Sequence, residues 1–183
     1  MRIILITQDE PFFLQESIKR LIENLPKDSE LVGCVVSDVS PFGKKESFTQ
    51  KAIKTLKIFG INFFIRYSIK YVFNKLFKKS VKNFLTSEGI NILKLTESIN
   101  SEKSLIKLRS LNPDLLISIA GNEIFKTDLI NLAPKGCLNL HTGLLPKYRG
   151  LMPTFWAMKN NEEYIGISVL FVDEGIDSGP IIE

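Results

Sequence analysis

Apolar positions along the chain follow two alternating patterns. Unbroken apolar runs, which are typical of strands buried on both faces of a sheet, occupy residues 3–6, 31–36 and 115–119. Apolar residues at helical spacing predict helices over residues 14–25, 101–111, 127–132 and 153–159. We expect Pro11 in the first turn of the first helix. Further strands are predicted over residues 90–95, 137–141 and 165–171.

The alternation of strands with helices predicts an α/β fold built on a doubly wound, mostly parallel sheet. Helices cover both faces of such a sheet, and ligands bind beyond the carboxyl ends of its strands. The residues at the ends of the predicted strands therefore mark the expected site: Thr7, Gln8, Ser37, Asp38, Ala120, Gly121, Asn122, His141 and Asp173.

The segment 44–84 interrupts this alternation. Its pattern predicts an inserted helical hairpin, with Gly60 between the two helices. The second helix carries an apolar stripe formed by Ile61, Phe64, Ile65, Ile69, Val72, Phe73 and Leu76. We favour packing of the hairpin on the sheet, with its lysines in solvent. Two alternatives stay open: a surface for an anionic acceptor, and a peripheral membrane contact through residues 61–77.

The same segment holds most of the positive charge. Residues 44–84 contain eleven Lys or Arg and one acid, Glu46, and so carry +10. The rest of the chain carries −6, which gives a net charge of +4. A basic insertion in an otherwise acidic chain suits an anionic partner. We do not expect this partner to be DNA.

The sequence predicts neither a membrane span nor a signal peptide. No apolar run approaches the roughly 20 residues that a span needs, and the first ten residues predict a strand. Cys34 and Cys137 lie in apolar surroundings without CxxC spacing, and there is no Cys/His cluster. We therefore expect a cytoplasmic protein with reduced cysteines and no metal site.

His141, the only histidine of the chain, ends the strand predicted over 137–141. Asn139 lies two positions earlier and therefore points to the same face. An amide donor and an imidazole base can polarise a carbonyl and manage a proton during acyl transfer without a covalent nucleophile. Asp177 is the candidate to orient the ring, in a loop where Gly175 and Gly179 are expected to permit a sharp turn. The N-x-H spacing alone favours a structural histidine. The position of His141 at a strand end and the glycine-flanked Asp177 bring the catalytic role level with the structural one.

Three stretches resemble the 10-formyltetrahydrofolate-dependent formyltransferase family. PDLLISIAGNEIF resembles the family's strand and folate loop, and NLHTGLLPKYRG resembles its N-x-H-x-S-L-L-P-x-x-x-G signature. VDEGIDSGPII resembles its D-x-G-x-D-x-G motif. The three motifs occur in the family's order and spacing over residues 113–183, whereas the likeness before Pro113 is architectural.

The resemblance implies a catalytic role for Asn139, His141 and Asp177. In the implied mechanism an acceptor amine attacks the formyl carbon directly. Asn139 and protonated His141 stabilise the oxyanion, and His141 or a water held by Asp177 manages the amine proton. The resemblance also implies two loops that enclose the pterin of the folate, largely through backbone groups. Their residues are Asn122, Glu123, Ile124, Phe125, Asp173, Glu174, Gly175 and Ile176.

The resemblance implies a Rossmann-like, folate-dependent N-formyltransferase that uses 10-formyltetrahydrofolate as co-substrate and no metal. Residues 1–183 are expected to form a single catalytic domain, with 44–84 inserted in it. The family's structure continues past Glu183, so two alternatives stay open: the domain is C-terminally truncated, or the protein has no acceptor-binding part. Two departures bear on function. Gly143 replaces the signature's serine, and TQDEPFFLQ lacks the glycines of the glycinamide ribonucleotide enzymes.

GLMPTFWAM is more similar to the methionyl-tRNA and sugar-modifying branches. The expected acceptor is thus the primary amine of a nucleotide-linked amino sugar or of methionyl-tRNA, and we lean toward the sugar because no further domain follows. Two alternatives stay open. The chain is a formyltetrahydrofolate hydrolase, in which water replaces the amine, or a non-catalytic module that binds folate or a nucleotide sugar.

Overall fold

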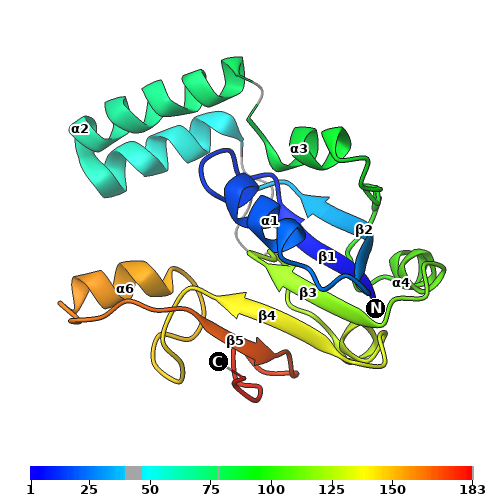
Figure 1. The fold of residues 1–183 in the computed structure, drawn as a ribbon. Helices are drawn as coiled ribbons and strands as arrows, with labels where there is room; N and C mark the ends of the chain where they lie inside the picture. Colours follow the sequence, from blue (N-terminus) through cyan, green and yellow to red (C-terminus); the bar gives the residue numbers. More distant parts are fainter. Residues whose placement is uncertain (40–46, 78, 183) are drawn as a thin grey trace.

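The computed structural model describes residues 1–39, 47–77 and 79–182. Its sheet has the order β2-β1-β3-β4-β5 (Figure 1). The strands are β1 (Arg2–Gln8), β2 (Glu30–Ser37), β3 (Leu115–Ile119), β4 (Cys137–His141) and β5 (Ser168–Phe171). The first four strands are parallel, and β5 runs antiparallel to β4. The predicted mostly parallel sheet is confirmed.

Helices cover both faces of the sheet because β1 is apolar on both. Leu5 points to one face, where it packs with α1 (Leu14–Glu23) and α3 (Val81–Ser87). Ile4 and Ile6 point to the other face, toward α4 (Glu102–Arg109) and α5 (Thr127–Ile130). A further helix, α6 (Pro153–Lys159), lies beyond the carboxyl end of β4 (Figure 1). The fold is therefore doubly wound, as predicted.

Several predicted elements differ in extent from the observed ones; the strand predicted over 165–171, for example, is observed over Ser168–Phe171. Residues 90–95 form no named strand, because pairing with β2 is limited to one isolated bridge from Ile92 to Cys34. The first helix begins at Leu14 and not at Pro11, because the Glu10 carboxylate caps it from outside. That carboxylate accepts the backbone N–H groups of Phe12, Phe13 and Leu14 at 2.8, 2.7 and 3.1 Å.

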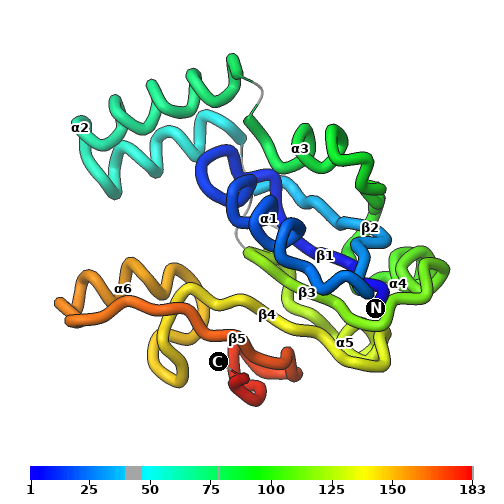
Figure 2. Tube along the Cα trace, viewed as in Figure 1, coloured from blue at the N-terminus to red at the C-terminus, as the bar shows by residue number. Residues whose placement is uncertain are grey.

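The predicted hairpin is present as α2 (Phe48–Leu76). Gly60 breaks it with φ 79° and ψ 172°, a conformation that glycine adopts without strain. The two arms lie antiparallel beside one another (Figure 2). Ser47 and Gln50 start the first arm with a capping box. Of the predicted insertion 44–84, residues 44–46 and Lys78 lie outside the described residues, and the end falls within α3, whose Val81 and Leu85 belong to the core.

The favoured packing of the hairpin on the sheet is wrong. The apolar stripe of the second arm is largely in solvent, with Ile69 65% exposed and Leu76 74% exposed. The sheet face on this side is already filled by Ile18 of α1 and by α3. Among the described residues of α2 only Asn74 is buried, and its Nδ2 donates to the Pro11 carbonyl at 2.8 Å.

Within the ranges given above, no helix has the length and apolar character needed to cross a membrane. The hairpin lies beyond the carboxyl ends of the parallel strands (Figure 1), and the sheet positions the candidate site.

Candidate active site

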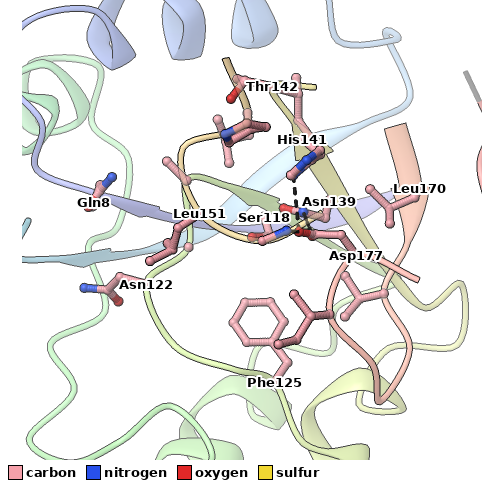
Figure 3. A pocket seen from close by; sticks show the side chains of 18 of the residues that line it. Gln8, Ser118, Asn122, Phe125, Asn139, His141, Thr142, Leu151, Leu170 and Asp177 are labelled. Carbon is pink, nitrogen blue, oxygen red and sulfur yellow. Dashed lines mark hydrogen bonds and ion pairs between the residues drawn. The ribbon is translucent and has the colours of Figure 1, made fainter. Parts of the chain in front are cut away.

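A cavity of about 880 Å³ lies at the carboxyl ends of the strands (Figure 3). Its walls come from the loop after β1, from α1, from the loop after β3, from the end of β4 and from the loop after β5. Six of the predicted strand-end residues line it: Gln8, Ala120, Gly121, Asn122, His141 and Asp173. Thr7, Ser37 and Asp38 do not line it.

Asn139, His141 and Asp177 meet in this cavity, and all three belong to its lining. The His141 Nδ1 lies 3.3 Å from Asp177 Oδ2, and the Asn139 Nδ2 donates to Asp177 Oδ1 at 3.3 Å (Figure 3). The two oxygens of one carboxylate thus contact the imidazole and the amide separately. The His141 side chain is 6% exposed and that of Asp177 is 17% exposed, so water screens this pair weakly.

The contact that Nε2 of His141 makes shows which ring nitrogen carries a hydrogen. The Nε2 lies 2.9 Å from the backbone carbonyl of Tyr148. A carbonyl oxygen only accepts, so Nε2 must carry the hydrogen and donate it. The Nδ1, which faces Asp177, is therefore the nitrogen able to take up or release a proton.

Asp177 is held in place by its own backbone and by the loop before α6. Its Oδ2 accepts the backbone N–H of Gly150 at 2.8 Å. Its φ of 47° lies in the left-handed region, which Asp adopts more readily than most residues. This conformation turns the carboxylate back toward β4.

The neighbouring glycines act differently from the sequence-based expectation. Neither Gly175 nor Gly179 has a positive φ. A Cβ on Gly179 would lie 1.9 Å from the backbone oxygen of Phe171, and a Cβ on Gly175 would lie 2.0 Å from Ser178 Oγ. These glycines therefore permit close packing of the loop, while the left-handed turn occurs at Asp177.

The loop after β3 presents mainly backbone and apolar groups to the cavity. The Glu123 carboxylate is engaged outside it, accepting from Ser98 Oγ at 2.5 Å and from the Ile99 N–H at 3.3 Å. The Asn122 Nδ2 donates to the Asp38 carbonyl at 2.9 Å, and Phe125 is buried beside the cavity. Asn122, Glu123, Ile124 and Phe125 all contribute to the lining.

The loop after β5 forms the facing wall. Asp173 Oδ1 accepts from the Gly175 N–H at 3.0 Å and from Ser178 Oγ at 2.8 Å, which stiffens the turn. Asp173, Gly175 and Ile176 line the cavity. Glu174 does not, because its carboxylate accepts from Thr127 Oγ1 at 2.5 Å on α5. Of the eight residues assigned to the two loops, Glu174 is thus the one that lies outside the lining.

Gly143, which occupies the position of the serine in the formyltransferase signature, is tightly enclosed. A Cβ at this position would lie 2.7 Å from Pro153 Cβ and 3.2 Å from His141 Nε2. The lack of a side chain at Gly143 therefore leaves room for both Pro153 of α6 and the His141 ring.

Sequence reasoning missed two parts of the site. The first is the pair of backbone groups that hold the catalytic candidates, namely the Tyr148 carbonyl and the Gly150 N–H, which no side-chain pattern identifies. The second is the wall formed by Phe13, Ser17 and Arg20. The helical periodicity placed these residues on α1 or at its start but gave no reason to link them to the cavity.

No group of three or more His, Cys, Asp or Glu side chains that could hold a metal ion occurs in the part of the chain that the structure describes.

Comparison with known proteins gives a consistent picture. The model of the family described as formyl transferase matches residues 1–183. Methionyl-tRNA formyltransferase from Thermodesulfovibrio yellowstonii is 41% identical over 86 residues, which cover 47% of this chain and 28% of that protein. The enzyme of the same name from Ruminiclostridium cellulolyticum is 38% identical over 108 residues, covering 59% and 34%. The matched region spans about a third of the length of these relatives.

Solved structures share the fold at low sequence identity. Glycinamide ribonucleotide transformylase 1 from Symbiobacterium toebii superposes with a TM-score of 0.64 at 17% identity, covering 100% of this chain and 71% of that one. A sugar N-formyltransferase from Shewanella sp. FDAARGOS_354 superposes with a TM-score of 0.55 at 18% identity, covering 99% and 55%. These superpositions concern the fold alone.

Proposed function

Because the chain belongs to the formyl transferase family, we propose that it transfers a formyl group from 10-formyltetrahydrofolate to a primary amine. The observation that carries this proposal is that Asn139 and His141 both contact the Asp177 carboxylate in the cavity. Residues 1–183 form the catalytic domain in this proposal, and the hairpin is inserted in it.

The cavity fits a folate co-substrate in size and in chemistry. Its volume of about 880 Å³ lies within the range of small-molecule sites. The residues that would hold the pterin are 122–125 and 173, 175 and 176, where the Glu123 and Glu174 carboxylates are engaged elsewhere. Backbone N–H and C=O groups would then read the pterin edge. When bound, 10-formyltetrahydrofolate supplies the formyl group.

The three polar side chains have separate roles in the proposed transfer. The Asn139 amide has two N–H groups, of which one donates to Asp177 and the second can donate to the formyl oxygen as negative charge develops there. Protonated His141 stabilises the same charge from Nδ1. Asp177 balances the imidazolium and holds both partners in position.

The amine proton passes through the same pair. As the amine nitrogen bonds to the formyl carbon, the bond from that carbon to the donor nitrogen breaks. A water held by Asp177 takes the amine proton, and protonated His141 gives its Nδ1 proton to the departing nitrogen. The proton taken up by the water and Asp177 then returns to Nδ1, which restores the starting state. The Nε2 hydrogen stays on the ring and donates to the Tyr148 carbonyl throughout, so the ring keeps its orientation.

Two acceptor classes are proposed, the amine of a nucleotide-linked amino sugar and that of methionyl-tRNA. The identity of 38–41% with methionyl-tRNA formyltransferases supports the second class. The shared fold with a sugar N-formyltransferase is compatible with the first.

A panel assay tests the function. The protein is incubated with 10-formyltetrahydrofolate and, separately, with amino-sugar nucleotides and methionyl-tRNA, beside the variant His141→Asn. We expect formylation of one acceptor class by the wild type and a loss of about 10²–10⁴-fold in the variant. Binding of the folate must be retained in the variant, which shows that the cavity is intact.

The other outcomes separate the alternatives. Formate release without any amine would identify a hydrolase. Binding of the folate with every acceptor unmodified, and no formate, would identify a binding module. Either result would refute the proposed transfer.

A further inference from the structure

The hairpin α2 exposes an unusual amount of apolar surface. Fourteen large hydrophobic side chains between Phe48 and Phe77 are exposed, among them Ile58, Ile69 and Leu76. They come from both arms, and the backbones of the two arms lie beside one another (Figure 1). Many exposed apolar side chains gathered on one segment mark a candidate interaction surface.

The same hairpin is strongly cationic. Residues 47–79 contain eight Lys or Arg and no acidic residue, so their charge is +8. The remainder of the chain then carries −4. The lysines alternate with the apolar residues along both arms, as in the stretch Lys54, Leu56, Lys57, Ile58 and Phe59. Long basic side chains in such a setting can lay their stems on an apolar layer and place their charges at its edge.

The hairpin is fixed to the rim of the candidate active site. Asn74 donates to the Pro11 carbonyl at 2.8 Å, and the rings of Phe12 and Tyr67 lie 4.5 Å apart. The Lys70 ammonium lies 4.2 Å from the centre of the Phe13 ring, and Phe13 lines the cavity. A surface that binds the hairpin would therefore lie close to the mouth of the cavity.

We propose that α2 docks this protein on an anionic lipid surface. The exposed apolar side chains enter the boundary between headgroups and acyl chains, and the lysines bind the lipid phosphates. The hairpin lies on the bilayer in this arrangement, which agrees with the finding that no described helix can span it.

The observations favour lipid over the other candidate partners. RNA would satisfy the cations but would leave most of the fourteen apolar side chains in water. A symmetric contact with a second copy would cover apolar surface but would bring +8 against +8. An anionic bilayer satisfies both features of the hairpin at once.

Flotation of the full chain with vesicles tests the proposal. Phosphatidylcholine vesicles with about a third phosphatidylglycerol are compared with pure phosphatidylcholine at about 0.1 M salt. We expect the protein to float with the anionic vesicles. The double variant Lys57→Gln/Lys75→Gln should bind about fivefold more weakly for each lysine removed. Ile69→Asn/Leu76→Asn should lose about tenfold for each residue, because both side chains leave the acyl boundary.

Matched controls use the body of the protein. Ile106 on α4 is 58% exposed, and Ile69 is 65% exposed. Ile106→Asn therefore removes a comparably exposed apolar side chain outside the hairpin. Lys94→Gln/Lys135→Gln removes two exposed lysines there. Both controls should float like the wild type, because their changes lie outside α2.

Three results would overturn the proposal. The first is wild-type protein that stays unbound with anionic vesicles, or that floats equally well after the hairpin substitutions. The second is salt-sensitive binding of transfer RNA through the same lysines without vesicle binding. The third is a dimer, measured by light scattering, that Ile69→Asn/Leu76→Asn converts to monomer without any vesicle binding. Flotation needs neither formyl donor nor amine, so its outcome is independent of the proposed transfer.

Discussion

His141 is held from both sides of its ring. Asp177 contacts Nδ1, and the Tyr148 carbonyl fixes the hydrogen on Nε2. The imidazole therefore has one orientation and one nitrogen available for proton transfer. Asp177 also contacts Asn139. Because its carboxylate contacts both other side chains, the geometry of the site depends on Asp177.

We predict that Asp177→Asn slows formyl transfer about 10²–10⁴-fold. The amide has the shape of the carboxylate and tolerates a φ of 47°, but it cannot balance an imidazolium. Single-turnover rates measure the effect. The control is Asp28→Asn, which makes the same change on an exposed loop and should leave the rate unchanged. An Asp177→Asn enzyme as fast as the wild type would exclude the proposed role.

Gly143 gives a prediction about packing. Restoring the signature's serine by Gly143→Ser should lower the free energy of unfolding by about 1–3 kcal/mol, because its Cβ would lie 2.7 Å from Pro153 Cβ. Urea denaturation measures this loss. A variant that is as stable as the wild type and transfers formyl groups faster would contradict this prediction. It would show that α6 can shift to make room for the serine at little cost.

The sequence identified the three polar side chains for physical reasons. Residues two apart on a strand share a face, which linked Asn139 to His141, and the family motif linked Asp177 to both. Backbone groups have no such signature, so the roles of Tyr148 and Gly150 became visible only in the structure. Gly179 was recognised as necessary but for the wrong reason, since its φ is ordinary and its packing is tight.

Strands are the elements that the sequence predicts best here. β1, β2 and β3 are buried on both faces, and such strands require unbroken apolar runs. The segment 90–95 is apolar too, but it lies beyond β2 at the edge and pairs through Ile92 alone. The hairpin was predicted as two helices and was misplaced, because periodicity cannot tell whether a face meets the sheet or another partner.

One polar residue inside β1 leads to a prediction of stability. Thr7 is fully buried, and in the described chain its Oγ1 is the buried side-chain oxygen without a hydrogen-bond partner. Thr7→Val should raise the free energy of unfolding by about 1 kcal/mol, because the desolvated hydroxyl is removed at constant shape. Thr154→Val is the control of opposite sign, since Thr154 Oγ1 donates to the Thr142 carbonyl at 2.8 Å. A less stable Thr7→Val would show that the hydroxyl has a partner.

The cysteines of β2 and β4 give a prediction about pH. Burial raises the pKa of Cys34 and of Cys137 from 9.0 to about 12. Both thiols stay protonated at pH 8, so the folded protein should not react with Ellman's reagent while the denatured chain does. The unfolded thiols ionise near pH 9, so the free energy of unfolding should fall as the pH rises from about 9 to 12. Rapid labelling of the folded state would show that the strands open easily.

At the scale of the whole molecule, the sheet brings its functional features to one end. α2 and α6 both lie beyond the carboxyl ends of the parallel strands (Figure 1), and the cavity opens at the same edge. The proposed chemistry and the proposed lipid contact are therefore neighbours, connected through Phe12 and Phe13.

Following the one-carbon unit itself tests the proposed formyl transfer without an intermediate assumption. The protein is given 10-formyltetrahydrofolate with an isotope-labelled formyl carbon, together with the acceptor panel, and each product is analysed by mass spectrometry. We expect labelled formamide on the amine of one acceptor class with the wild type, and a loss of that label with His141→Asn. Label found only in free formate, or equal labelling by wild type and variant, would contradict it.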